Sequence, residues 1–194
     1  MEIPLVSGDA LIVTDVQNDF LPGGSLAVAK SEEIIPILNR YIEFFRARQL
    51  PVMATRDWHP PNHCSFYQQG GQWPAHCIAN THGASFPDGL ELPVETQIVS
   101  KADTPDEEAY SSFGGGRLHE LLQSAGIKRV FIGGLTTDYC VLNTVKDALL
   151  YGYATFLLTD AVRAVNVQPN DGLRALAEMA RLGAVPIRFE ELAA

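Results

Sequence analysis

The sequence predicts a three-layer α/β/α sandwich around a mainly parallel sheet of roughly six strands. Short apolar runs alternate with amphipathic segments along most of the chain. Continuous apolar runs suit strands that are buried on both faces, as they are in parallel sheets. Glycine follows three of the amphipathic segments, as Gly126, Gly152 and Gly183, and there it suits the end of a helix.

The individual elements follow from these patterns in chain order. The first apolar run ends in Asp15 and indicates a buried strand. Segment 31–48 repeats its apolar residues at helical spacing, and Ser31 suits its N-cap. The same reasoning predicts strands at 50–57, 96–102, 129–134, 154–161 and 185–190, and helices at 116–126, 139–152 and 171–183.

We expect a single domain over residues 1–194, because a chain of this length can bury a sizeable core without dividing. One stretch, at about residues 57–92, loses all periodicity and is rich in Pro, Gly, His, Asn and Trp. Long irregular segments inside compact domains are often functional. We therefore interpret this stretch as a functional insertion.

Composition excludes several classes of partner. The net charge of −9 disfavours binding to nucleic acid or to anionic lipid. No apolar run is long enough to span a membrane, and we expect no secretory signal, since the N-terminus lacks a basic segment followed by an apolar one. The chain has three cysteines, an odd and low number that argues against a disulfide framework. Free cysteines are typical of the reducing cytoplasm, so we expect the protein there.

Four reactive side chains fall at or just after the predicted carboxyl ends of strands, where α/β sheets bind their ligands. They are Asp15, Asp57, Lys101 and Cys140.

Cys140 can be interpreted either as a buried core residue or as a nucleophile. At the start of a helix, the helix dipole would favour its thiolate. Asp15 could move the thiol proton, and Lys101 could hold the carboxylate and stabilise the thiolate. Taken alone, Asp15 is more often a turn residue, and Lys101 is more often a solvated lysine. Taken together with Cys140, the two residues predict a cysteine triad without histidine. Backbone N–H groups in the turn before Cys140 and at Cys140 could form an oxyanion hole.

The irregular segment carries a candidate metal site. In extended chain, Asp57 and His59 point to the same side, and His76 adds a second imidazole. One carboxylate and two imidazoles suit zinc, manganese or iron with open positions. His63 is a further candidate, either as a ligand or as a group that hydrogen-bonds to a ligand. The alternative without a metal is that the histidines of this segment only cap turns. A closed zinc site is the less favoured alternative, built from His63, Cys64, His76 and Cys77.

Aromatic and apolar residues near these positions predict a pocket for a flat heteroaromatic ring, although each could instead pack in the core. They are Phe20, Leu26, Trp73 and Tyr110.

These motifs resemble the nicotinamidases of the isochorismatase-like cysteine hydrolase superfamily, over nearly the whole chain. The matching segments are VTDVQNDFLPGGSLAV, RDWHPPNHCSF, WPAHCIANTHGASF, the lysine after QIVS, and GGLTTDYCV. The resemblance implies that Asp15, Lys101 and Cys140 are the catalytic triad. It also implies that the N–H groups of Thr136 and Cys140 form the oxyanion hole, with a cis Leu135–Thr136 bond.

The resemblance also assigns the other site residues. It implies that Asp57, His59 and His76 bind one divalent metal ion, with zinc preferred, and that His63 is a ligand only in some members. The metal would meet the ring nitrogen directly or through its waters. The pocket that sandwiches the pyridine ring would consist of Phe20, Leu26, Trp73 and Tyr110.

The implied activity is hydrolysis of nicotinamide to nicotinate and ammonia through a thioester, with pyrazinamide as a second substrate. The implied cellular role is salvage of NAD precursors in pyridine nucleotide biosynthesis. Thr136 stands where the family often has Ala, and His82 where it often has Pro or Trp. Both differences lie at the edge of the pocket and put the substrate range in question.

Other functions remain open at this point. The first alternative is a hydrolase of the same superfamily that acts on another amide or a ureido compound. A non-catalytic binding protein on this fold and a structural metal module are less favoured, because the triad is complete. The sequence does not decide whether the protein is a homo-oligomer.

Overall fold

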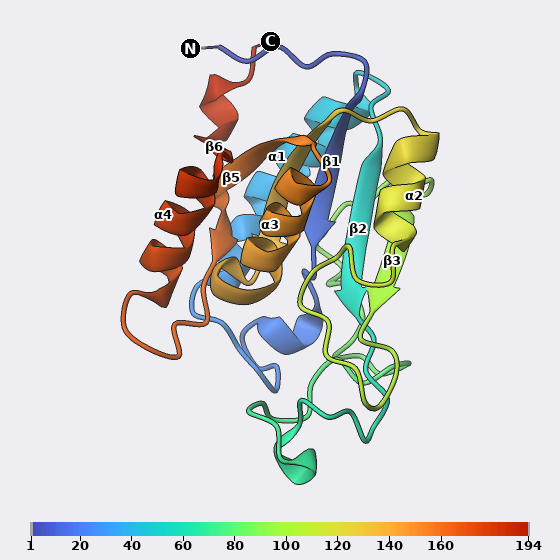
Figure 1. Cartoon of the computed structure of the whole chain (residues 1–194), viewed down its shortest axis with the longest axis vertical. Helices are drawn as coiled ribbons and strands as arrows, with labels where there is room; N and C mark the ends of the chain where they lie inside the picture. Colours follow the sequence, from blue (N-terminus) through green and yellow to red (C-terminus); the bar gives the residue numbers. More distant parts are fainter. Residues whose placement is uncertain (1, 194) are drawn as a thin grey trace.

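The computed structural model describes residues 2–193, and its centre is one parallel β-sheet (Figure 1). Six strands lie in the order β3-β2-β1-β4-β5-β6, and every neighbouring pair is parallel. This confirms the predicted fold class. The strands are β1 (Asp9–Thr14), β2 (Val52–Asp57), β3 (Gln97–Lys101), β4 (Arg129–Leu135), β5 (Ala154–Arg163) and β6 (Val185–Ile187).

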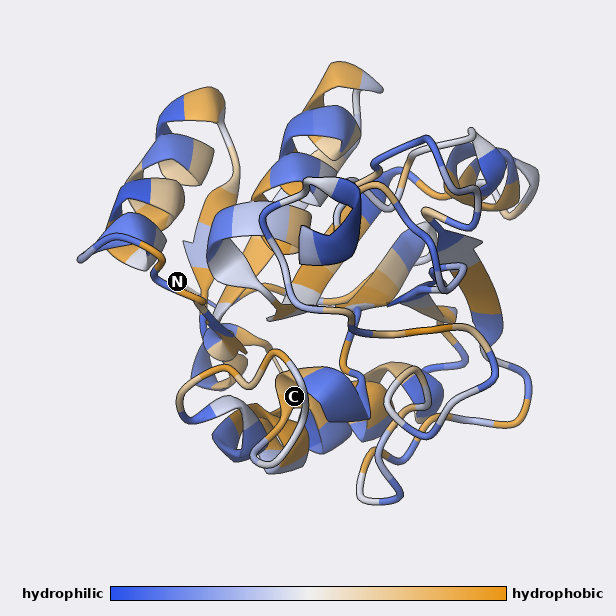
Figure 2. Cartoon of the chain, turned by 90° about the horizontal axis from the view of Figure 1, so that it is seen from below, coloured by the Kyte–Doolittle hydropathy of each residue, from blue (hydrophilic) through white to orange (hydrophobic). Residues whose placement is uncertain are grey.

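Helices cover both faces of the sheet, so the molecule has three layers (Figures 1 and 2). One helix, α1, lies behind the sheet in Figure 1, and three helices lie in front of it. Figure 2, seen from below, shows the sheet edge-on between these two layers. The helices are α1 (Ile34–Arg46), α2 (Arg117–Ser124), α3 (Leu142–Leu150) and α4 (Asp171–Leu182).

Strand β1 shows why the layers form. All six of its residues are buried. Leu11 and Val13 pack into the core beneath α1, whereas Ala10 and Ile12 pack into the core shared with α2, α3 and α4. Successive strand residues point to opposite faces, so a continuous apolar run can serve both cores.

Two helix starts differ from the expectation. Ser31 begins a 3₁₀ turn, Ser31–Glu33, and within residues 2–193 its hydroxyl has no hydrogen-bond partner. The chain enters α1 through this turn, so the capping role expected for Ser31 is wrong. The helix expected at 139–152 begins at Leu142, and residues 139–141 belong instead to one π-helical turn, Thr137–Val141. There the Val141 N–H donates to the Thr136 carbonyl, five residues earlier, at 3.0 Å. Single π-turns of this kind frequently mark functional sites.

The segment between β2 and β3 is irregular, as the sequence indicated. It extends beyond the carboxyl ends of the strands and then returns to the opposite end of the sheet, where β3 begins (Figure 1). It contains one 3₁₀ turn, Tyr67–Gln69, and two isolated bridges that pair His59 with Ile78 and Phe66 with Trp73. Within residues 2–193, none of the helices is long and apolar enough to cross a membrane.

Candidate active site

The four reactive residues predicted at the strand ends meet because their strands are neighbours. Asp57 pairs with Lys101 in the register of β2 and β3. Asp15 follows β1, which lies next to β2. Cys140 comes from the other side, in the π-helical turn after β4, and β4 also pairs with β1. Gly134 permits this approach, because a Cβ there would collide with the backbone of Thr14.

Lys101 lies at the centre of this group, and its side chain is only 1% exposed. It bridges the carboxylates of β1 and β2 and also contacts the thiol. The distances from Nζ are 2.9 Å to Asp15 Oδ2, 2.5 Å to Asp57 Oδ1, 3.5 Å to Cys140 Sγ and 3.1 Å to the Ala109 carbonyl oxygen.

The charges of this cluster follow from burial and proximity. Burial alone would lower the pKa of Lys101, but the carboxylates of Asp15 and Asp57 raise it well above its ordinary value. Lys101 is therefore an ammonium ion. Burial raises the pKa of Asp15, while Lys101 opposes that rise. Asp15 can thus accept a proton more readily than an exposed aspartate.

The Cys140 thiol is protonated at rest, which corrects one expectation. Burial raises its pKa well above the ordinary value, and the nearby Asp15 and Asp57 raise it further, while Lys101 lowers it. The sequence predicted a thiolate favoured by a helix N-terminus. Instead the side chain is nearly fully buried, in a π-helical turn, and desolvation is the largest cause of the raised pKa. Attack by this sulfur therefore needs a base.

Asp15 is placed to be that base. Its Oδ1 accepts a hydrogen bond from Thr55 Oγ1 at 2.7 Å. Among residues 2–193, its Oδ2 has the ion pair with Lys101 but no hydrogen bond of good geometry. Carboxylate oxygens of Asp15 and Asp57 and the sulfur of Cys140 all lie within 4.8 Å of one another. One oxygen of Asp15 is thus held in place, and the other is available for the thiol proton.

The turn before Cys140 offers two backbone donors. The Leu135–Thr136 bond is cis, as the resemblance implied. In the part of the chain that the structure describes, the Thr136 N–H makes no backbone hydrogen bond outside helices and strands, and the Cys140 N–H lies in the π-helical turn that follows. Free N–H groups beside a nucleophile are the usual elements of an oxyanion hole.

The predicted metal ligands also come together. Ligand atoms of Asp57, His59 and His76 lie within 4.8 Å of one another, and all three residues are buried. His59 Nδ1 lies 3.1 Å from the Ala102 carbonyl, and His76 Nδ1 lies 2.8 Å from the Pro74 carbonyl. Backbone carbonyls therefore fix both rings and leave Nε2 free, the usual arrangement behind metal-binding histidines. Burial lowers the pKa of His59 to about 4, so its imidazole is neutral, as a ligand must be. This donor set fits a divalent metal ion.

His63 lies beside the metal ligands but is held by other groups. Its ring stacks near that of His59, with centroids 4.2 Å apart. Its Nδ1 lies 2.7 Å from Ser65 Oγ, and its Nε2 lies 3.0 Å from the Glu107 carbonyl. Both nitrogens thus have protein partners. The alternative closed site is not assembled, since neither Cys64 nor Cys77 joins a group of metal-binding side chains within residues 2–193.

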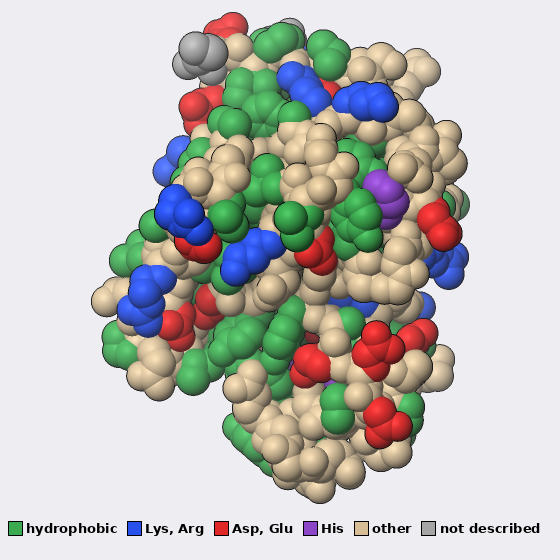
Figure 3. All heavy atoms as spheres, in the orientation of Figure 1, with side chains coloured by type: hydrophobic (Ala, Val, Ile, Leu, Met, Phe, Trp, Pro, Cys, Tyr) green, Lys and Arg blue, Asp and Glu red, His purple; other side chains and the backbone are tan. Residues whose placement is uncertain are grey.

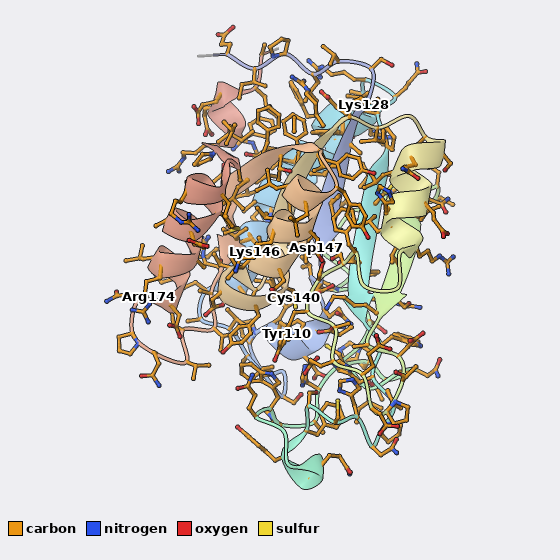
Figure 4. All side chains as sticks on the ribbon, viewed as in Figure 1. Tyr110, Lys128, Cys140, Lys146, Asp147 and Arg174 are labelled. Atoms are coloured by element: carbon orange, nitrogen blue, oxygen red, sulfur yellow. The ribbon has the colours of Figure 1, made fainter. Side chains whose placement is uncertain are left out.

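A pocket that is partly open to solvent is lined both by Cys140 and by the metal-binding side chains. Figure 4 shows Cys140 and Tyr110 below the ends of the strands, where both line this pocket. Its wall contains the four predicted ring-binding residues and the three predicted metal ligands. The lining consists of Phe20, Leu26, Asp57, His59, Ser65, Trp73, His76, Glu108, Tyr110, Thr136, Tyr139, Cys140 and Val165.

Comparison with known proteins identifies the family. Residues 9–191 match the isochorismatase domain. The chain belongs to the isochorismatase family. A nicotinamidase of Escherichia coli is 37% identical, over 90% of this chain and 92% of its own length. A nicotinamidase/pyrazinamidase of Mycobacterium tuberculosis is 35% identical, over 88% and 93%.

Solved structures of family members agree in fold. The pyrazinamidase of Pyrococcus horikoshii in complex with zinc is 48% identical, with a TM-score of 0.90 over 94% of this chain and 99% of that one. A protein from L. infantum in complex with nicotinate is 35% identical, with a TM-score of 0.92 over 100% of both chains.

The pocket of this isochorismatase-family protein includes residues that the sequence did not reveal. Tyr139 precedes Cys140, and its ring centroid lies 4.9 Å from that of Trp73 and 5.3 Å from that of Tyr110. Trp73 Nε1 donates to the Tyr110 hydroxyl at 3.1 Å, so these three aromatic rings form one wall. The sequence carried one signal for Tyr139, which is that it stands next to the candidate nucleophile. Ser65, Glu108 and Val165 gave no comparable signal.

Proposed function

We propose that this protein is a metal-dependent cysteine amidase that hydrolyses nicotinamide to nicotinate and ammonia. One observation carries the proposal. Cys140, which lies 3.5 Å from Lys101 Nζ, lines the same pocket as the imidazoles of His59 and His76. A carboxamide at Cys140 would thus share a pocket with a site for the ring nitrogen. The nicotinamidase relatives support this substrate.

Acylation begins with proton transfer to Asp15. The Cys140 thiol gives its proton to Asp15 Oδ2, and the sulfur attacks the carboxamide carbon. The N–H groups of Thr136 and Cys140 stabilise the resulting oxyanion. Asp15 then returns the proton to the amide nitrogen, the C–N bond breaks, and ammonia leaves. The acyl group stays on Cys140 as a thioester.

Deacylation uses the same groups, with water as the nucleophile and the Cys140 sulfur as the leaving group. Asp15 takes a proton from water as the water attacks the thioester carbon, and the same N–H groups hold the second oxyanion. The C–S bond breaks, the sulfur recovers its proton from Asp15, and the product leaves as nicotinic acid, which releases its proton to solvent and becomes nicotinate. Lys101 keeps its charge throughout and balances the negative charge that passes between Asp15 and Cys140.

Asp57, His59 and His76 would hold the metal ion, and we propose zinc, which is the metal of the P. horikoshii structure. When bound, a divalent ion supplies a Lewis-acid contact for the pyridine nitrogen, directly or through water. The aromatic wall of Trp73 and Tyr110, with Phe20 and Leu26 among the other lining residues, would enclose the ring. Pyrazinamide keeps this ring shape and the carboxamide, so we propose it as a second substrate.

The reaction places the protein in the recovery of NAD precursors, and we propose a cytoplasmic enzyme because its cysteines are free. An isochorismatase-family hydrolase of another amide or ureido compound is the alternative. A structure of an N-carbamoylsarcosine amidase from Thermoplasma acidophilum is 29% identical with a TM-score of 0.81. The alternative is not favoured, because the nicotinamidases and the pyrazinamidase are more similar in sequence, at 37%, 35% and 48% identity.

The test compares nicotinamide with benzamide, which lacks the ring nitrogen. Ammonia release is measured for protein loaded in turn with zinc, manganese or iron, and again after chelation. We expect turnover of nicotinamide, a rate with benzamide lower by roughly 10-fold or more, and loss of nicotinamide turnover on chelation with recovery when metal returns. No turnover of nicotinamide or pyrazinamide with any of the three metals would contradict the proposal.

A further inference from the structure

Three buried hydroxyl groups form a chain that ends at Asp15. Thr55 Oγ1 lies 2.7 Å from Asp15 Oδ1, Ser112 Oγ lies 3.0 Å from Thr55 Oγ1, and Thr144 Oγ1 lies 3.0 Å from Ser112 Oγ. Thr55, Ser112 and Thr144 are each 0% exposed. Their residues come from β2, from the loop before α2, and from α3.

The direction of the hydrogen bonds in this chain is determined at both ends. Since an ionised carboxylate only accepts, Thr55 must donate to Asp15, and Thr55 then accepts from Ser112. At the other end the Ser112 N–H donates to Thr144 Oγ1 at 3.0 Å, and Thr144 donates to Ser112 Oγ. All three hydroxyl protons therefore point toward Asp15. Aligned hydrogen bonds in a buried chain strengthen one another.

The chain joins the two ends of the proposed proton transfer. Thr144 stands four residues after Cys140, about one helical turn away. The hydroxyl chain therefore connects the strand end that carries Asp15 to the helix that follows the nucleophile. The hydrogen bond from Thr55 to Oδ1 restrains the rotation of the Asp15 carboxylate.

We propose that Thr55 is a positioning residue, which acts with Ser112 and Thr144 to hold one oxygen of Asp15 so that the other faces Cys140. This role rests on the proposed function, because it assumes that Asp15 exchanges protons with Cys140. It concerns the chemical step and not the binding of the ring, since none of the three hydroxyl residues lines the pocket.

Thr14 provides a matched control on the neighbouring strand. It precedes Asp15, is 0% exposed, and its hydroxyl has no hydrogen-bond partner within residues 2–193. Thr14→Val therefore removes a buried hydroxyl next to the base without breaking a hydrogen bond to it. Thr55→Val makes the same chemical change but removes the donor to Asp15.

The experiment measures kcat and KM for nicotinamide in the wild type, Thr55→Val, Thr55→Ser and Thr14→Val, with thermal unfolding of each. We expect Thr55→Val to lower kcat by about 10- to 100-fold, the range for a hydrogen bond to a charged group, with KM within about twofold. Thr55→Ser should recover most of kcat, and Thr14→Val should resemble the wild type. Ser112→Ala, which keeps Thr55, should lower kcat by a smaller factor.

Three results would overturn this role: unchanged kcat in Thr55→Val, a Ser variant as impaired as the Val variant, or an equal loss of kcat in Thr14→Val. If Thr55→Val does not fold, Ser112→Ala decides, and an unchanged kcat in that variant then rejects the role. Failure of the proposed function is distinguishable, because the wild type itself would then release no ammonia from nicotinamide.

Discussion

Lys101 and Asp15 form an ion pair, 2.9 Å from Nζ to Oδ2, in which the side chains are 1% and 0% exposed. Water does not screen such a pair, and Asp57 shares the same ammonium group. The single cation thus offsets two carboxylates, and it also contacts the proposed nucleophile. We therefore expect both the stability of the fold and the proposed catalysis to depend on Lys101.

Removal of this cation should destabilise the fold. Lys101→Met keeps most of the apolar side chain but leaves Asp15 and Asp57 buried without a counter-ion. We expect the free energy of unfolding to fall by about 3–5 kcal/mol, as measured by urea denaturation of metal-free protein. Arg46→Ala is the control, because its pair with Glu43 is exposed and should contribute less than about 1 kcal/mol. Equal losses in the two variants would show that Lys101 is not needed to balance the buried charge.

Gln17 should tune metal affinity without contacting the metal. Its side chain accepts from the Asp57 N–H at 2.8 Å and donates to the Asp57 and Ala84 carbonyls at 2.8 and 2.9 Å. Gln17→Leu removes these hydrogen bonds. Mutation of groups that hydrogen-bond to metal ligands commonly lowers metal affinity by about 10- to 100-fold. We expect a fall of that size in zinc competition with a chromophoric chelator. Gln123→Leu, at an exposed position on α2, is the control, and affinity equal in both variants would exclude this role.

Asp138 should control substrate binding through a loop. Its two carboxylate oxygens accept from the N–H groups of Val165 and Asn166, at 3.0 and 2.8 Å, and Val165 lines the pocket. Asp138→Ala frees this loop, so KM for nicotinamide should rise by about 5- to 20-fold, the equivalent of roughly 1–2 kcal/mol. Asp147→Ala, on α3 outside the pocket lining (Figure 4), should leave KM unchanged. An unaltered KM in Asp138→Ala would mean that the loop holds its position without this carboxylate.

Acidic side chains also lie on the lower part of the surface, below the strand ends (Figure 3), and Glu108 lines the pocket. The product nicotinate is an anion, whereas the substrate is neutral. Glu108→Gln should therefore strengthen inhibition by nicotinate by about 2- to 5-fold at low salt, with less effect on KM. Steady-state product-inhibition measurements at two salt concentrations check this, and tighter nicotinate binding in the wild type than in the variant would contradict it.

Much of the fold and the site was predictable because both depend on local patterns. Asp15, Asp57 and Lys101 follow buried apolar runs, and the carboxyl ends of parallel strands meet at one edge. The D-x-H spacing of Asp57 and His59 indicated a shared side of the chain. His76 and the pocket aromatics depended more on the resemblance to a family than on spacing.

Features that depend on tertiary contacts were not predictable. The π-helical turn requires the Thr136 carbonyl to accept from the N–H of Val141 instead of from that of Cys140, and no sequence signal marks that choice. The burial of Cys140 reversed the expected direction of its pKa shift. Thr55 and Ser112 stand 57 residues apart and Thr144 a further 32, so their hydrogen-bonded chain exists only once the fold has formed.

The most direct test of the central claim is ammonia release from nicotinamide by metal-loaded Cys140→Ala, compared with Cys64→Ala and the wild type. Cys64 is a free, partly exposed cysteine outside the pocket lining. We expect Cys64→Ala to keep most of the activity and Cys140→Ala to lose more than about 1,000-fold, as expected when a covalent nucleophile is removed. Turnover by Cys140→Ala at a rate close to that of the wild type would contradict a thioester mechanism at this pocket.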